Sequence, residues 1–288
     1  MATTREIRRR IRSIGSTAQI TKAMQMVAAS KMRKAQHAAT SVRPFLRLLY
    51  RMQRVALTQA EDFVHPLIEK RPIKKRAIML VSSDRGLCGA LNSNLFRLAA
   101  PYDLASTLFI AAGRKAAQFV SRSQRQLVAD FPYADTPRYA EARAMSAMAR
   151  DLFVKGEVDE VRIIATRFVN TLSQEPIDVA LLPIGKITSL KIPGVSVEDY
   201  EEPERPYFLF EPDVDTVLGY LLSRYLDIFL YITLLNAKAS EQSARMVSMK
   251  TATDSAESMI DELTLEYNKL RQGHITQELL EIAGGQAS

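Results

Sequence analysis

The feature that most constrains this 288-residue chain is a run of 53 residues, Tyr220 to Gln272, that contains neither glycine nor proline. These two residue types are the ones that most often end or kink a helix, so the run predicts one very long helix. If the helix starts soon after Pro212, it has about 70 residues and, at 1.5 Å per residue, a length of roughly 100 Å. No globular core is that wide, so we expect this helix to protrude.

A second run without glycine or proline lies near the N-terminus, from Ser16 to Arg43. Alternating steps of four and three residues give a mostly small or apolar seam in each of the two segments. The seam residues are Ile7, Ile11, Ile14, Ala18, Thr21, Gln25, Ala28, Met32, Ala35, Ala39, Val42, Leu46 and Leu49, and then Leu235, Ala239, Gln242, Met246, Met249, Thr253, Ala256, Ile260, Leu263, Tyr267 and Leu270. A long helix is stable only when its seam is covered. We therefore predict an antiparallel two-helix coiled coil rather than two separate helices of a bundle.

The distribution of charge along the chain is more informative than its net value of +7. Residues 1–54 contain 13 Lys and Arg against one acidic residue, Glu6, whereas residues 212–288 contain 6 against 11. The part between them is balanced. Such polarity predicts an acidic partner for the N-terminal segment: a nucleic acid, a membrane surface, an acidic protein or the chain's own C-terminal segment.

The middle of the chain alternates between strand-like and helix-like segments, which predicts a Rossmann-like α/β domain. We expect strands at residues 77–81, 106–110, 161–165 and 177–182, and helices at residues 92–100, 114–122 and 138–155. The connection before the last strand, Asn170–Pro176, is too short for a helical crossover, so the last two strands should be antiparallel and the sheet mixed. The chain is thus predicted to be an α/β protein with coiled-coil helices at residues 1–60 and 212–288 and a central domain at residues 68–211.

The most enzyme-like stretch is the loop Ser82–Gly89, which follows a strand and precedes a helix, where α/β proteins place phosphate loops. It lacks the Lys and Ser/Thr of a P-loop and the three spaced glycines of a dinucleotide loop. Cys88 has no neighbouring histidine to act as a base, so we interpret it as a buried structural thiol. The acidic residues near the C-terminus are interpreted as a solvated helix face. We expect no catalytic residue, no cofactor and no metal site.

The basic N-terminus is not followed by the apolar segment of a signal peptide, and no stretch approaches the ~18 consecutive apolar residues of a membrane span. The single cysteine, Cys88, excludes an intramolecular disulfide. These features predict a protein of the cytoplasm or an equivalent compartment.

Five segments, spread in order along the chain, carry a family resemblance. They are Ile20–Lys34 (ITKAMQMVAASKMRK), Ser83–Gly89 (SDRGLCG), Asn170–Gln174 (NTLSQ), Ser240–Met249 (SEQSARMVSM) and Tyr267–Glu278 (YNKLRQGHITQE). Together they closely resemble the gamma subunit of F-type ATP synthase. The resemblance implies a central rotor shaft that turns inside a hexameric ring of alpha and beta subunits and couples ion flow to ATP synthesis or hydrolysis.

In that family the chemistry resides in the beta subunits, so the resemblance implies that this chain is not an enzyme on its own. It implies four partners, which are the alpha and beta subunits, the epsilon subunit and the membrane c-ring, and it implies no nucleic acid. It also implies a peripheral position on the cytoplasmic face of the bacterial plasma (inner) membrane, without direct membrane insertion.

Matched position by position, the resemblance assigns three sets of contact residues: to the acidic loops of the beta subunits, to a beta-subunit catch loop, and to a foot that meets the membrane ring and epsilon. In that order they are Met24, Lys31, Arg33 and Lys34; Arg271, Gln272 and Thr276; and Phe208, Phe210 and Glu211. The C-terminal end is expected in an apolar bearing at the top of the ring.

The residues alone leave two other classes of protein open. A basic coiled-coil nucleic-acid-binding protein would explain the charge of residues 1–54, but aromatic residues enter this stretch only near its end, at Phe45 and Tyr50. Salt-dependent binding of an oligonucleotide would distinguish it. An α/β enzyme with helical arms should turn over a nucleotide as an isolated chain, and we expect no such turnover.

Overall fold

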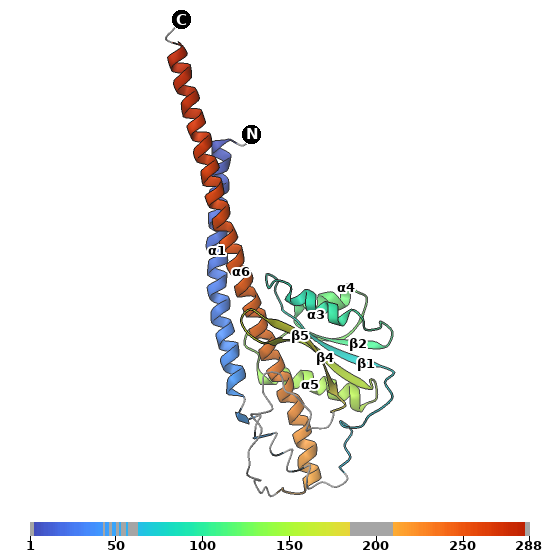
Figure 1. Cartoon of the computed structure of the whole chain (residues 1–288). Coiled ribbons are helices and arrows are strands. Elements are labelled where there is room, and N and C mark those ends of the chain that lie inside the picture. The colour runs from blue at the N-terminus through green and yellow to red at the C-terminus, as the bar shows by residue number, and fades with distance from the viewer. Residues whose placement is uncertain are drawn as a thin grey trace. The chain divides into compact units, whose positions relative to one another are not determined.

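The computed structural model describes residues 3–42, 44–45, 48–49, 52, 56, 63–184 and 210–285 (Figure 1). Two long helices, α1 (Thr4–Ser41) and α6 (Val214–Gly285), flank a segment of alternating strands and helices. The elements of that segment are β1 (Arg76–Val81), α3 (Leu91–Ala99), β2 (Thr107–Ala112), α4 (Arg114–Arg122), β3 (Gln126–Phe131), α5 (Tyr139–Val154), β4 (Glu160–Phe168) and β5 (Gln174–Leu182). The chain divides into two compact units, Met1–Ala28 with Arg245–Ser288, and Ala29–Ala244.

The long C-terminal helix predicted from the missing glycines and prolines is confirmed, and α6 extends over 72 residues. Its start is fixed by Asp213, whose carboxylate accepts hydrogen bonds from the backbone N–H and the hydroxyl of Thr216, both at 2.8 Å. These bonds also lower the pKa of Asp213. This is the N-capping arrangement that satisfies free N–H groups in the first turn of a helix.

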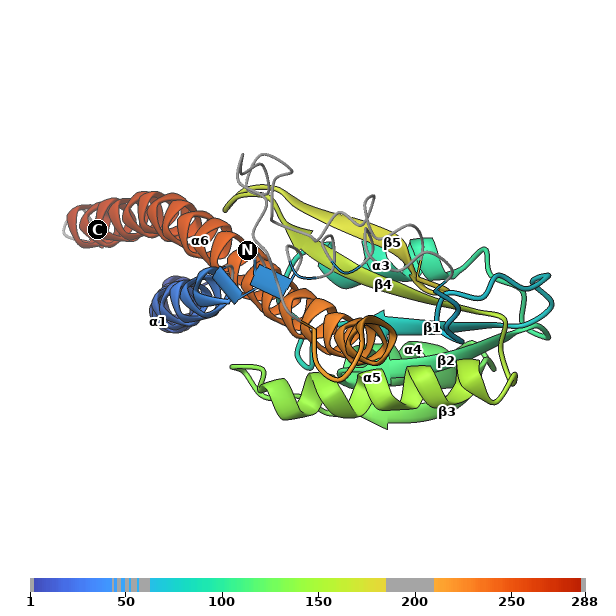
Figure 2. The ribbon, with the colours of Figure 1, turned by 90° about the horizontal axis from the view of Figure 1, so that it is seen from below.

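The central domain contains a five-stranded sheet in the order β3-β2-β1-β4-β5 (Figure 2). β1 pairs in parallel with β2 and with β4, and β2 pairs in parallel with β3. β4 and β5 are antiparallel, because a tight turn at Asn170–Ser173 joins them. The predicted mixed sheet and its antiparallel pair are therefore confirmed.

The four predicted strands correspond to β1, β2, β4 and β5, and the three predicted helices to α3, α4 and α5. The prediction omitted β3, which lies at the edge of the sheet. Its side chains alternate between exposed and half-buried, as expected for a strand with one face covered and the other open to solvent.

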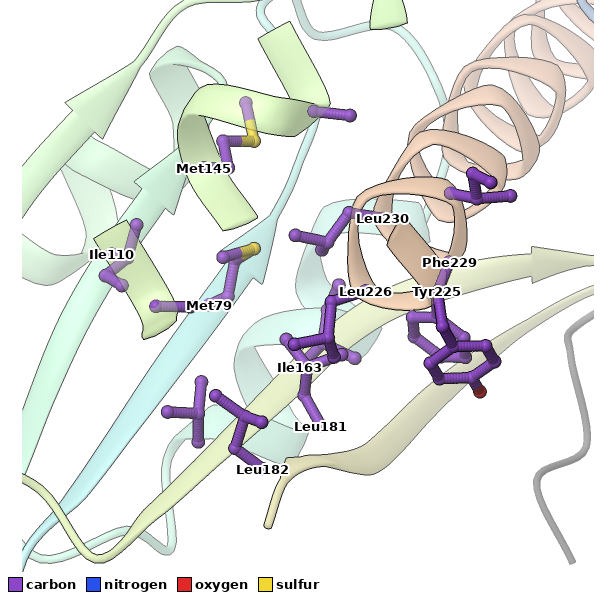
Figure 3. Packing of buried hydrophobic residues seen from close by; sticks show 14 of the residues in the cluster. Met79, Ile110, Met145, Ile163, Leu181, Leu182, Tyr225, Leu226, Phe229 and Leu230 are labelled. Atoms are coloured by element: carbon purple, nitrogen blue, oxygen red, sulfur yellow. The ribbon is translucent and has the colours of Figure 1, made fainter. Parts of the chain in front are cut away.

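Two apolar layers cover the sheet. On one face α5 and the first half of α6 pack against the strands, and Figure 3 shows Leu226 and Leu230 of α6 directed toward Ile163 and Met79 of the sheet. On the other face α3 and α4 cover a second cluster, which includes Phe109 and Cys88. The N-terminal half of α6 is thus a core helix of the central domain.

That core position explains the apolar character of α6. By length and composition alone, one window of this helix could cross a membrane, but 67% of the window is buried inside the protein. Burial on nearly all sides requires apolar residues on nearly all sides.

In the other unit, α1 and α6 form a coiled coil. The hydroxyls of Thr21 and Thr253 are 2.6 Å apart, and a Cβ placed on Gly15 would lie 4.0 Å from the side chain of Ile260. From the first contact to the second, the α1 residue changes from Thr21 back to Gly15, while the α6 residue changes from Thr253 forward to Ile260. The two helices are therefore antiparallel, as predicted. Every buried residue of α1 belongs to the predicted seam: Ile7, Ala18, Thr21, Ala28, Met32 and Ala35.

Candidate functional site

The C-terminal end of α6 has an unusual surface for a helix in water. The coil register places Thr4, where α1 begins, level with about residue 270 of α6. Beyond that level, no described helix covers α6. Ile275, Leu279 and Leu280 are nevertheless apolar, and the two leucines are 61% and 67% exposed. Large apolar side chains that are exposed together mark a surface that a partner covers.

Arg271, Gln272 and Thr276 lie at the start of this uncovered end, and all three are exposed. Gln272 and Thr276 share one face, and the Thr276 hydroxyl donates a 2.9 Å hydrogen bond to the carbonyl of Gln272. Arg271 lies about 100° further round the helix, since each residue of an α-helix turns by that angle. Gln272 and Thr276 therefore lie on one face of the helix, and Arg271 lies on the adjacent face.

The N-terminal helix carries the basic set. Arg33 and Lys34 are exposed, and Met24 is half-buried. Ile20 and Val27 are also on this helix and are 60% and 55% exposed. α1 therefore presents both basic and apolar side chains outward.

Lys31 differs from its basic neighbours because it has a partner within the chain. Its ammonium donates to the carboxylate of Asp135 at 2.5 Å. This hydrogen bond is the main reason why the pKa of Asp135 is lowered, and the charges of Lys238, Lys31 and Arg85 lower it further. Part of the Lys31 charge is thus already neutralised.

The sequence did not predict the cluster around Lys238, a lysine that is only 1% exposed. Its ammonium lies 3.0 Å from Glu241 and 3.7 Å from both Asp84 and Asp135, and it stands 4.7 Å from the ring centre of Tyr133. Burial, followed by the charges of the three carboxylates, raises the pKa of Tyr133 well above its ordinary value. A possible signal was the apolar run that precedes Lys238 on α6, which marks a helix buried all round.

The prediction of a solvated acidic face near the C-terminus is correct for Asp254, Glu257 and Asp261, which are exposed. It is wrong for Asp227 and Glu241, each only 3% exposed. The guanidinium of Arg150, on α5, forms an ion pair with the carboxylate of Asp227 at an N–O distance of 2.8 Å, and Glu241 forms an ion pair with Lys238. Buried carboxylates of this kind require such partners.

The loop Ser82–Gly89 binds the N-terminus of α4. The first three N–H groups of α4 donate to this loop, from Arg114 to Asp84 and from Lys115 and Ala116 to Ser83 and Ser82. Gly113, at φ +91°, allows this close approach, since a Cβ there would lie 2.4 Å from the carbonyl oxygen of Ser82. The N-terminus of α4 is thus satisfied within the protein and is not free to bind an anion.

Cys88 lies in this loop and is buried, as predicted, at 2% exposure. The amide of Asn92 donates to its sulfur at 3.4 Å. Among the described residues no group of three or more His, Cys, Asp or Glu side chains has the arrangement of a metal site.

The expected foot residues lie just before α6. Phe210 is half-buried and Glu211 is exposed, whereas Phe208 lies outside the described residues.

These features define a class of protein: one with two long helices that form a coiled coil, an α/β domain, and exposed apolar and basic side chains on the helices. The sequence profile of the ATP synthase family matches residues 3–288. The ATP synthase gamma chain of Opitutus terrae is 46% identical over 292 residues, covering 99% of this chain and 98% of that one. The gamma chain of Methylacidiphilum infernorum is 42% identical, with 99% of both chains covered. The chain therefore belongs to the ATP synthase gamma-chain family.

Two solved structures share the fold. The rotor of the Euglena gracilis mitochondrial ATP synthase matches with a TM-score of 0.62 at 19% identity, covering 94% of this chain and 98% of that one. The central stalk of the Tetrahymena thermophila mitochondrial enzyme matches with a TM-score of 0.60 at 23% identity, covering 81% and 99%. The chain is a non-catalytic rotary subunit of the membrane-associated ATP synthase complex, and the nucleic-acid alternative has no support.

Proposed function

We propose that this chain is the shaft that turns inside a ring of alpha and beta subunits, with the uncovered end of α6 in contact with the ring. The observation that carries the proposal is the exposed apolar surface of Ile275, Leu279 and Leu280 beyond the level where α1 begins. In water this surface is unfavourable, whereas an apolar bearing would bury it.

Arg271, Gln272 and Thr276 are the proposed contacts to a catch loop of one beta subunit. The guanidinium of Arg271 can bind a carboxylate through two donors, and the Gln272 amide can both donate and accept. Because these side chains occupy neighbouring faces of a single helix, the shaft can engage one beta subunit at a time. Such a contact stabilises one conformation of a site over another only by its differential binding free energy.

The basic face of α1 is proposed to meet the acidic loops of the beta subunits. Arg33 and Lys34 carry most of this proposal because they are exposed, Lys31 contributes less because it pairs with Asp135, and Met24 contributes apolar contact. At the other end, Phe208, Phe210 and Glu211 are the proposed foot toward epsilon and the c-ring. The complex would then lie on the cytoplasmic face of the bacterial plasma membrane, with this chain peripheral.

The catch assignment is tested with Arg271→Ala combined with Gln272→Ala in the assembled complex. We expect steady-state ATP hydrolysis and synthesis to fall several-fold, since charge-assisted hydrogen bonds in a partly desolvated contact contribute about 1.5–3 kcal/mol each. Lys155→Ala, an exposed lysine of the α/β domain, is the matched control and should leave both rates unchanged. Unchanged rates in the double variant at equal assembly would mean that these side chains only solvate the helix.

A further inference from the structure

The carboxyl edge of the sheet is the place where Rossmann-like domains take their ligands, at the point where the strand order reverses. Here that point lies between β1 and β4. The residues that follow these strands contact α6: Asp84 lies 3.7 Å from Lys238, and the Ser243 hydroxyl donates to the carbonyl of Thr171 at 2.7 Å. The long helix therefore occupies the crevice that a ligand would fill.

Lys238 is a charged side chain of α6 that is buried at this edge of the sheet, with 1% of it exposed. A lysine ammonium is strongly hydrated, so its burial is tolerated only where other groups replace the water. Three carboxylates and one aromatic ring do so: Glu241 of α6, Asp84 after β1, and Asp135 and Tyr133 after β3. The hydroxyl of Tyr133 donates to the carbonyl of Ser82 at 2.8 Å, which fixes the ring under the ammonium.

The second shaft helix joins the same cluster through Asp135. One oxygen of this carboxylate accepts from Lys31 of α1, and the other faces Lys238 of α6. Asp135 therefore bridges cations from both helices, while Asp84 binds one of them from a second loop. We call Lys31, Asp84, Asp135, Lys238 and Glu241 the charge lock.

We propose that the charge lock is a positioning site for rotary coupling: it fastens α1 and α6 to the α/β domain so that all three turn together under torque. The proposal rests on the shaft function proposed above. Apolar packing of α6 against the sheet resists separation, but it is non-directional and permits small sliding. The ion pairs of Lys238 resist sliding, because its side chain is only 1% exposed and a displacement that removes Asp84 and Asp135 would leave part of its charge uncompensated in a buried position.

The test uses the assembled complex in inverted membrane vesicles, with ATP hydrolysis and the ATP-driven membrane potential measured together. A voltage-sensitive dye reports the potential whichever ion is moved. Lys238→Met removes the ammonium and keeps an unbranched side chain of similar length. Asp84→Asn combined with Asp135→Asn removes the lock from the domain side, where both side chains are partly exposed and where Asn can still accept the N–H of Arg114.

Three comparisons make the result specific. Lys238→Arg keeps the cation, so its potential per ATP hydrolysed should be higher than that of Lys238→Met. A loss of packing alone would not predict this difference. Lys155→Met removes an exposed lysine of the same domain and should behave as the unmodified complex. Hydrogen exchange of the complex reports whether α6 around residues 238–243 and the loop after β1 lose protection.

For Lys238→Met and for the double Asn variant we expect at least a twofold lower potential per ATP hydrolysed, with faster exchange at these segments. An unchanged ratio with faster exchange would show a purely structural cluster and overturn the positioning role. An unchanged ratio with unchanged exchange would overturn the lock itself. Failure of the catch assignment would appear instead as unchanged hydrolysis in Arg271→Ala with Gln272→Ala, so the two proposals fail separately.

Discussion

The coiled coil of Met1–Ala28 with Arg245–Ser288 and the sheet-containing unit Ala29–Ala244 bury very different side chains. The coil buries mostly small ones, such as Ala18, Ala28 and Ala256, and it exposes Ile20, Met259 and Leu265. The sheet-containing unit buries Phe109, Phe153 and Met145 completely. Apolar burial contributes roughly 25 cal/mol per Å², so large side chains stabilise the second unit far more.

The comparison shows that one chain combines a domain whose core contains large side chains with a helix pair whose seam contains mostly small ones. A small-residue seam lets two helices approach closely and leaves large apolar groups on the outside. Those outer groups are stabilising only when another protein covers them. The predictions below test this difference, starting with the largest effect.

The strongest contrast is expected between Phe153→Ala in the domain and Ile7→Ala in the coil. Both side chains are at most 1% exposed. Phe153→Ala should lower the free energy of unfolding of the domain by about 3–5 kcal/mol, whereas Ile7→Ala should cost nearer to about 2 kcal/mol because the end of a two-helix coil can close partly around the space. Native-state hydrogen exchange of β1 and β4 amides, compared with α1 amides, measures the two effects separately. Equal losses would mean that the coil has a core as tightly packed as the domain's.

Much of the fold was predictable because its signals are local in sequence. The absence of glycine and proline predicted α6, and the four-and-three spacing predicted the seam. β3 was missed because only one of its faces is covered, so Leu127, Ala129 and Phe131 alternate with exposed residues, of which Val128 is also apolar. Alternation of period two was the available signal.

The residues of the candidate site also fall into two groups: those that the sequence predicts and those that only the structure brings together. Arg271, Gln272 and Thr276 were predicted from a short motif on one helix, where the residues lie close together in sequence. The charge lock was missed because its members come from α1, α6 and two loops, up to 210 positions apart between Lys31 and Glu241. No spacing along the chain indicates such a cluster, since a lysine on a helix is normally solvated.

A smaller effect is expected at the polar point of the coil seam, the pair Thr21 and Thr253. The two hydroxyls lie 2.6 Å apart across the seam, and both threonines are buried. Within its own helix, the Thr21 hydroxyl can donate to the carbonyl of Ala18, and the Thr253 hydroxyl can donate to the carbonyl of Met249. Thr21→Val leaves one buried hydroxyl without its partner across the seam and should cost about 1–2 kcal/mol, whereas Thr21→Val with Thr253→Val should be nearly neutral in stability.

The double variant should instead lose the specificity of register, as buried polar pairs specify register in coiled coils. The register places Ala18 level with Ala256, so cysteines at these two positions, in a Cys88→Ala background, should crosslink in the parent protein. With both threonines replaced, crosslinks between position 18 and positions one heptad away, 249 or 263, should increase. A single native crosslink in both backgrounds would show that the small-residue packing sets the register without the hydroxyl pair.

The smallest effect is expected at acidic pH, where the Asp135 carboxylate of the sheet-containing unit becomes protonated. It compares the two units by a charge interaction rather than by packing. The pKa of Asp135 in the folded chain is lowered from its ordinary value of 3.8, first by the hydrogen bond from Lys31. A carboxyl group with a lowered folded pKa stabilises the folded state at pH values above the ordinary pKa, and this contribution is lost as the pH falls through the folded pKa. Asp135→Asn should therefore weaken the domain at pH 7 and lose its difference from the parent well below pH 4.

Asp135 is more than half exposed, so the difference at pH 7 should be small and should shrink further at high salt. Urea unfolding at pH 7 and near pH 3, followed by exchange of the domain amides, measures it. Asp151→Asn, which changes an exposed carboxylate of α5, is the matched control. The coil amides should not respond to Asp135→Asn at either pH, because all contacts of Asp135 lie within the unit Ala29–Ala244. A response of the coil equal to that of the domain would mean that the two units unfold as one cooperative body, which would remove the contrast between them.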